Sequence, residues 1–129
     1  MARFQWTTEY TVFQGEFDAE HRELFRLGED VYRATQSADA QAVADATRRL
    51  IAEVDAHFQH EERMMRAAHY SGYDWHKRQH DGARRRLQEI TASPDDLLDY
   101  LAGWLRDHTG VADRMMTASL RNAERADPQ

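Results

Sequence analysis

Seven histidines occur among the 129 residues of this sequence, and the spacing of several of them suggests chemistry. His57 and Glu61 are four residues apart, as are His76 and His80, so each pair would share one face of a helix. A buried polar group without a partner costs about 1–3 kcal/mol, whereas a metal ion turns imidazole and carboxylate groups into its ligands. The spacing therefore indicates a metal site with nitrogen and oxygen ligands.

Six of these polar residues occupy positions that should face the core of a helical protein. One histidine at such a position is more often a satisfied core residue, and one His/Glu pair is more often on the surface. Six such groups in one small core have to compensate one another, which favours the metal site. The six are His21, His57, Glu61, His76, His80 and His108; we expect His60 at the surface and His69 in a loop.

Asp113 would join this cluster only if the helix after His108 departs from regular geometry. A gap of five residues turns about 140° in an α-helix, which would point Asp113 away from the core. Gly110 lies between the two residues, and we expect it to break the helix, so that a new turn brings Asp113 back inward.

The number of ligands suits two ions better than one. If both carboxylates bridge and a solvent-derived oxo or hydroxo group adds a third bridge, a three-to-two division of the histidines leaves one metal six-coordinate and the other five-coordinate. The open position on the second metal would bind a ligand. Nitrogen and oxygen donors without sulfur favour Fe or Mn, allow Zn, and disfavour Cu(I) and iron–sulfur clusters.

Four helices would have to position these side chains, and capping residues and periodicity predict all four. Ser93 is the strongest start signal, because it is followed by Pro94 and two acidic residues. With short connections, such helices pack antiparallel around one core. The expected helices begin at the capping residues Asp18, Asp39, Asp74 and Ser93. The first ends at about Gln36, and the last inward-facing residues of the other three are Met64, Ile90 and His108.

Composition favours an all-α fold, an up-down-up-down four-helix bundle in a single domain over residues 1–129. Proline occurs only twice, and 31% charged with 41% hydrophobic residues is typical of long amphipathic helices. The apolar residues of segment 1–17, Trp6 among them, suggest an N-terminal arm laid across the bundle. The bundle would span residues 18–120, ending in a short C-terminal helix, and 121–129 would be a tail.

Charge and cysteine content exclude several function classes. Without cysteine there are no disulfides, thiolate ligands or cysteine nucleophiles. A net charge of −6 argues against nucleic acid as a partner, and no apolar run is long enough for a signal peptide or a membrane span. We expect a cytoplasmic monomer with no membrane insertion. The arginines at 84–86, with Lys77 and Arg78, are expected to form a solvated face; the alternative is a docking patch for an acidic partner.

These residues resemble the hemerythrin family, most closely its single-domain bacterial members. The resemblance covers nearly the whole chain, from Trp6 to Asp113, and its combined pattern is highly specific. It rests on Asp18-Ala19-Glu20-His21, His57-Phe58-Gln59-His60-Glu61-Glu62, His76-Lys77-Arg78-Gln79-His80 and Trp104-Leu105-Arg106-Asp107-His108.

The resemblance implies a non-haem di-iron centre that binds O₂ reversibly, for carriage, storage or delivery, and catalyses no reaction. The irons would cycle between Fe²⁺ and Fe³⁺ under an oxo or hydroxo bridge, and O₂ would bind at the open iron. By position, His76, His80 and His108 would hold the saturated iron, His21 and His57 the open iron, and Glu61 and Asp113 would bridge. Leu24, Phe58, Trp104 and Leu105 match the family's apolar O₂ pocket, although core packing alone also explains them.

Three other functions remain open. The chain could be a sensing module for O₂, redox state, iron or nitric oxide that acts through a partner. A di-iron oxidase or ferroxidase is less favoured, because such sites use Glu-x-x-His pairs and no histidine here has a glutamate three residues before it. A purely structural bundle leaves the core histidines unexplained.

Two positions depart from the family pattern: Thr109 replaces a branched aliphatic residue, and Met116 often corresponds to tyrosine. If Thr109 lines the pocket, its hydroxyl would hydrogen-bond the bound ligand and hasten autoxidation. We therefore expect Thr109→Ile to lengthen the life of the oxygenated form, measured by its visible absorption in air. Equal autoxidation half-lives in the two proteins would contradict this prediction.

Overall fold

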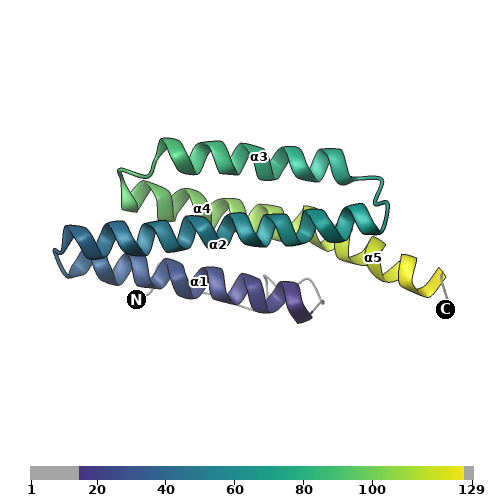
Figure 1. Cartoon of the computed structure of the whole chain (residues 1–129), viewed down its shortest axis with the longest axis horizontal. Coiled ribbons are helices and arrows are strands. Elements are labelled where there is room, and N and C mark those ends of the chain that lie inside the picture. The colour runs from purple at the N-terminus through teal and green to yellow at the C-terminus, as the bar shows by residue number, and fades with distance from the viewer. Residues whose placement is uncertain (1–14, 127–129) are drawn as a thin grey trace.

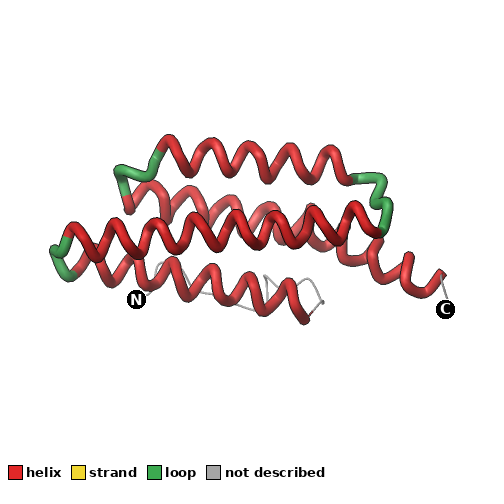
Figure 2. The backbone as a smooth tube through the Cα atoms, viewed as in Figure 1, coloured by secondary structure: helices red, strands yellow, loops and turns green. Residues whose placement is uncertain are grey.

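The computed structural model describes residues 15–126, with side chains to residue 122, so Trp6 and most of the expected arm lie outside the described residues. Four helices lie side by side along the long axis and are joined by short turns, so neighbours in sequence are antiparallel (Figures 1 and 2). This confirms the all-α, up-down-up-down bundle. The elements are α1 (Gly15–Gln36), α2 (Ala40–Ala67), α3 (Tyr73–Glu89), α4 (Pro94–His108), a π-helical turn η2 (Thr109–Asp113) and α5 (Arg114–Ala126).

Two of the four expected capping residues act as caps. The Asp39 carboxylate accepts hydrogen bonds from the backbone N–H groups of Gln41 and Ala42, and the Ser93 hydroxyl accepts one from Asp96. These bonds satisfy N–H groups that have no partner inside the helix. They explain why α2 and α4 begin where the sequence predicts.

The other two expected capping residues lie inside their helices, so both predictions were wrong. Asp18 is buried within α1, which already includes Gly15, and Asp74 lies in the first turn of α3, where Gly72 precedes the helix. Both acids lie near the positive end of a helix dipole, which favours a negative charge there. At the other end of the chain, α5 continues to Ala126, past residue 121, where the tail was expected.

The helix does not break at Gly110, contrary to the prediction. Residues Thr109–Asp113 instead form a π-helical turn that joins α4 to α5 without interruption. A π turn holds one more residue than an α turn, so a five-residue gap returns to the same side of the helix. Asp113 is therefore buried on the same side as His108, and the predicted inward return of Asp113 is correct.

Two apolar clusters fill the interior, and the polar cluster lies between them along the helices. The larger is centred on residues such as Leu24, Leu50 and Leu101; the smaller comprises Phe17, Met65, Met116 and Leu120. No helix among the described residues has the length and apolar character needed to cross a bilayer.

Candidate metal centre

The structure brings all seven sequence-predicted ligands into one buried cluster, drawn from the four bundle helices and the π turn. Their relative exposure is 4% or less. They form two overlapping groups, each with its ligand atoms within 4.8 Å of one another, and both groups contain Glu61 and Asp113. The first group adds His76, His80 and His108; the second adds His21 and His57.

The two carboxylates are oriented so that each faces both groups of histidines. Glu61 Oε2 lies 2.9 Å from His57 Nε2, while its Oε1 lies 3.1 Å from His76 Nε2 and 3.0 Å from His80 Nε2. Asp113 Oδ2 lies 3.3 Å from His21 Nε2, and its Oδ1 lies 3.0 Å from the Nε2 atoms of both His76 and His108. Each carboxylate thus presents one oxygen to each group, which is the arrangement that two bridging carboxylates need.

Despite these short distances, several of these atoms make no hydrogen bond of acceptable geometry with any described residue. They include Glu61 Oε2, His80 Nε2 and both carboxylate oxygens of Asp113. Leaving such buried atoms unsatisfied costs about 1–3 kcal/mol each, more for charged groups. Two cations shared between the groups would satisfy them together, so the residues present fit a two-metal site.

The electrostatics of the cluster favour cations. Burial alone would lower the pKa of His57, but Glu61 and Glu20 outweigh it and raise that pKa to about 10. Asp113 and Glu61 likewise outweigh the burial of His76 and raise its pKa to about 9. Burial would raise the pKa of Glu61, yet His57 and the other histidines hold it well below its usual value. Burial and Glu61 would raise the pKa of Asp113 as well, but His108 and His21 hold it below its usual value. Glu61 and Asp113 are therefore ionised carboxylates, whose negative charge attracts metal ions.

Three histidine rings of the cluster are fixed from behind by side chains that sequence reasoning did not assign to the site. Glu20 accepts a hydrogen bond from Nδ1 of His57 at 2.6 Å, Glu62 from Nδ1 of His80 at 2.8 Å, and Gln79 from Nδ1 of His108 at 2.7 Å. A proton on Nδ1 leaves Nε2 free to bind a metal. Each of the three supporting residues is adjacent in sequence to a predicted ligand, which is the signal that could have found them.

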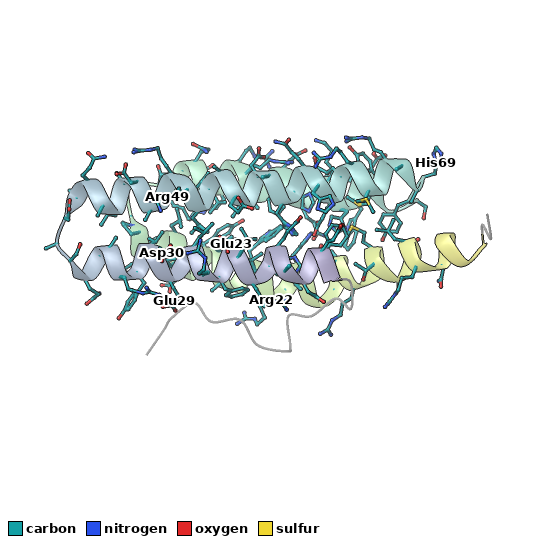
Figure 3. The ribbon with its side chains drawn as sticks, turned by 60° about the horizontal axis from the view of Figure 1, so that its bottom comes forward. Arg22, Glu23, Glu29, Asp30, Arg49 and His69 are labelled. Atoms are coloured by element: carbon teal, nitrogen blue, oxygen red, sulfur yellow. The ribbon has the colours of Figure 1, made fainter. Side chains whose placement is uncertain are left out.

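His60 and Arg84 lie differently from the prediction, whereas His69 is exposed in the α2–α3 turn as expected (Figure 3). The His60 side chain is only 21% exposed, and its Nδ1 lies 2.6 Å from the second oxygen of Glu20. Arg84 does not belong to a solvated face: it donates to Glu62 at 2.8 Å and to Asp55 at 2.7 Å. His60 and Arg84 thus contact Glu20 and Glu62, the carboxylates that accept hydrogen bonds from His57 and His80.

Two of the four residues of the expected O₂ pocket stack on histidine rings of the cluster. Phe58 stacks on His80 with centroids 4.0 Å apart, and Trp104 stacks on His108 at 4.2 Å. Leu24 and Leu105 are buried in the larger apolar cluster, which Trp104 also contacts. Thr109 is buried in the π turn beside His108, and Met116 is buried in the smaller cluster.

Replacing Glu62 with alanine is expected to lower iron affinity by 10- to 100-fold, the usual effect of removing a support behind a metal-binding histidine. The measurement is iron binding in competition with a chelator, under argon. Glu89→Ala is the matched control, because Glu89 is exposed and pairs only with Arg86 among the described residues. Equal affinities in the two variants would contradict a role for Glu62 at the metal site.

The comparisons with known proteins agree with this geometry. The Hemerythrin HHE cation binding domain model matches residues 13–118. The chain belongs to the hemerythrin family. It is 31% identical to a myohemerythrin of Sipunculus nudus over 111 residues, which cover 85% of this chain and 88% of that protein. It is 29% identical to a bacteriohemerythrin of Ralstonia nicotianae, over 93% of this chain and 90% of that one.

Comparison with solved structures supports the fold. A crystal structure of a hemerythrin point variant superposes with a TM-score of 0.84 at 21% identity and covers 93% of this chain and 98% of the other. The predicted resemblance to the hemerythrin family is therefore confirmed in sequence and in architecture.

Proposed function

We propose that this hemerythrin-family protein binds O₂ reversibly at a non-haem di-iron centre, as a cytoplasmic monomer and not as an enzyme. The observation that supports it best is the pair of overlapping ligand groups that share Glu61 and Asp113. The expected metal ligands His21, His57, Glu61, His76, His80, His108 and Asp113 are all members of those groups.

The two groups differ in the number of histidines, and this difference supports binding of an external ligand. His76, His80 and His108 would hold one iron, whereas only His21 and His57 would hold the other. The second iron would therefore have the open position. When bound, the iron pair supplies two electrons to O₂ and recovers them on release.

The apolar neighbours of the cluster would protect reversibility. Leu24, Phe58 and Leu105 are buried, and Phe58 lies against Trp104 at 5.2 Å between ring centroids. Apolar walls exclude water and slow the entry of protons, which would otherwise convert the bound oxygen to released peroxide. We propose these four residues as the walls of the O₂ pocket.

The test is anaerobic reconstitution with ferrous iron, a count of iron per chain, and repeated exchange between O₂ and argon. Two irons per chain, with a charge-transfer colour that forms in O₂ and disappears under argon, would support the proposal. A centre that never colours, or one that consumes O₂ and reductant continuously, would overturn it; the second result would indicate an oxidase.

Metal loading should also raise stability, because the ions bind the folded chain. At a free metal concentration 100 times Kd the gain is about 2.7 kcal/mol for each bound ion, and Tm would rise by roughly 10 °C per ion in a chain of this size. Thermal unfolding followed by circular dichroism, with and without Fe²⁺ under argon, measures it. Glu61→Ala should show no comparable rise, and an unchanged Tm in the parent protein would contradict metal binding by the cluster.

A further inference from the structure

An open groove with a volume of about 570 Å³ lies between α3 and α4, which run side by side in Figure 1. It extends from the surface to His108, which forms part of its lining. A volume of this size falls in the range of small-molecule sites. The groove approaches the metal centre from outside the helix bundle. Of the four residues proposed for the O₂ pocket, only Trp104 lines it.

Exposed apolar side chains line part of the groove. Among the described residues, the large apolar side chains that are exposed are Trp75 at 40%, Val111 at 58% and Met115 at 53%, and the first two line this groove. Tyr100 and Trp104 add two further rings. Exposed apolar surface gathered in a concave site indicates ligand binding, and aromatic walls favour a planar aromatic ligand.

The charges at the groove favour an anion, although the protein as a whole is negative. Arg78 and Arg86 both belong to the lining, and Arg78 has no hydrogen bond or ion pair with any described residue. Arg86 contacts the exposed Glu89. Asp107 also lines the groove, but it lies 3.4 Å from Arg106, which offsets its charge. Arginine is well suited to phosphate and carboxylate groups and also stacks on aromatic rings.

Gly82 leaves space in the groove, although no neighbouring atom would exclude a larger side chain at this position. It lies in the interior of α3, where glycine weakens a helix relative to alanine. A Cβ atom built at this position would meet no atom within 4 Å. The missing side chain therefore relieves no clash within the protein, and its effect is to widen the groove.

Two side chains that contact His108 also line this groove. Gln79 accepts the hydrogen bond from His108 Nδ1, and Trp104 stacks on the His108 ring at 4.2 Å. A molecule in the groove would contact both. Its binding site would thus lie directly behind one proposed iron ligand.

We propose that the α3–α4 groove binds a planar aromatic anion of the class represented by flavin mononucleotide. The rings of Trp75, Tyr100 and Trp104 would contact its aromatic plane, and Arg78 and Arg86 its phosphate. This site goes beyond the proposed O₂ binding and does not depend on iron.

The test is equilibrium dialysis of the full-length, iron-loaded protein against flavin mononucleotide, and separately against riboflavin, which lacks the phosphate. We expect saturable binding of one flavin mononucleotide per chain and at least tenfold weaker binding of riboflavin. Gly82→Leu, which fills the groove, should weaken flavin mononucleotide binding at least tenfold. Removing the two cations with Arg78→Ala/Arg86→Ala should reduce binding to the level of riboflavin.

Two controls match these variants outside the groove. Gly103→Leu adds the same side chain to α4, where a Cβ has only an ordinary contact with Arg106. Arg33→Ala/Arg49→Ala removes two exposed arginines from other helices; Arg49 is visible on α2 in Figure 3. Both controls should bind as the parent does.

Several results would overturn the proposal. They are an absence of saturable binding, binding that Gly82→Leu does not weaken, and equal affinity for riboflavin and flavin mononucleotide. Competition by inorganic phosphate at the same concentration as flavin mononucleotide would show a simple anion site and would also overturn it.

Discussion

His57→Ala is expected to leave one iron per chain and abolish O₂ binding, whereas Glu61→Ala is expected to lose both irons. The difference follows from the two ligand groups: His57 belongs only to the second, but Glu61 belongs to both. Without His57, the group of Glu61, His76, His80, His108 and Asp113 stays complete. Without Glu61, each group loses a carboxylate that faces several histidine nitrogens at 2.9–3.1 Å.

Iron per chain, measured after anaerobic loading and desalting, and the O₂-dependent colour distinguish the two variants. His69→Ala is the control, because His69 is exposed and belongs to neither group; it should retain both irons and the colour. Circular dichroism of each variant shows whether the helices persist. Reversible colour in folded His57→Ala, or two irons in folded Glu61→Ala, would contradict the assignment of these ligands.

The second large effect is expected from changing the number of residues in the π turn. An alanine inserted after Gly110 would rotate everything beyond it by about 100°. Asp113 would leave the cluster, and Met116 and Leu120, which lie on the same helix beyond it, would leave the smaller apolar cluster. We expect this insertion to abolish binding of two irons and to lower the stability of the fold.

Deleting Gly110 should have the opposite outcome. His108 and Asp113 would then be four residues apart, and in a regular α-helix such residues share a face. The deletion therefore converts the π turn to an α turn while Asp113 still points inward, and we expect the variant to bind close to two irons per chain. Iron analysis and thermal unfolding compare the pair. Loss of iron in a folded deletion variant, or two irons in the insertion variant, would contradict this account of the turn.

Much of the fold follows from local features of the sequence. Asp39 and Ser93 cap helices as predicted, because a capping bond joins residues only two or three positions apart. The spacing of His76 and His80 places both on one face by helix geometry alone. The predicted start of α3 was wrong, because Asp74 interacts favourably with the helix dipole from inside the first turn as well as from the capping position.

The inward position of Asp113 depends on tertiary packing as well as on local sequence. The sequence indicates that a regular helix would turn this carboxylate outward, and Gly110 marks the place where the helix departs from regular geometry. Whether the helix breaks or widens depends on what the following residues pack against. Here Met116 and Leu120 have a core to fill, and a continuous π turn keeps both them and Asp113 inside.

By itself, the sequence placed six candidate metal ligands at inward-facing positions, because helical periodicity relates residues three or four positions apart. Asp113 needed a departure from that periodicity to join them. Only the tertiary structure decided what lies behind those ligands. Glu20 supports His57 from 37 residues away, and Arg84 reaches Asp55 across 29. Such contacts depend on how the helices align along the bundle, and many side chains packing together set that alignment.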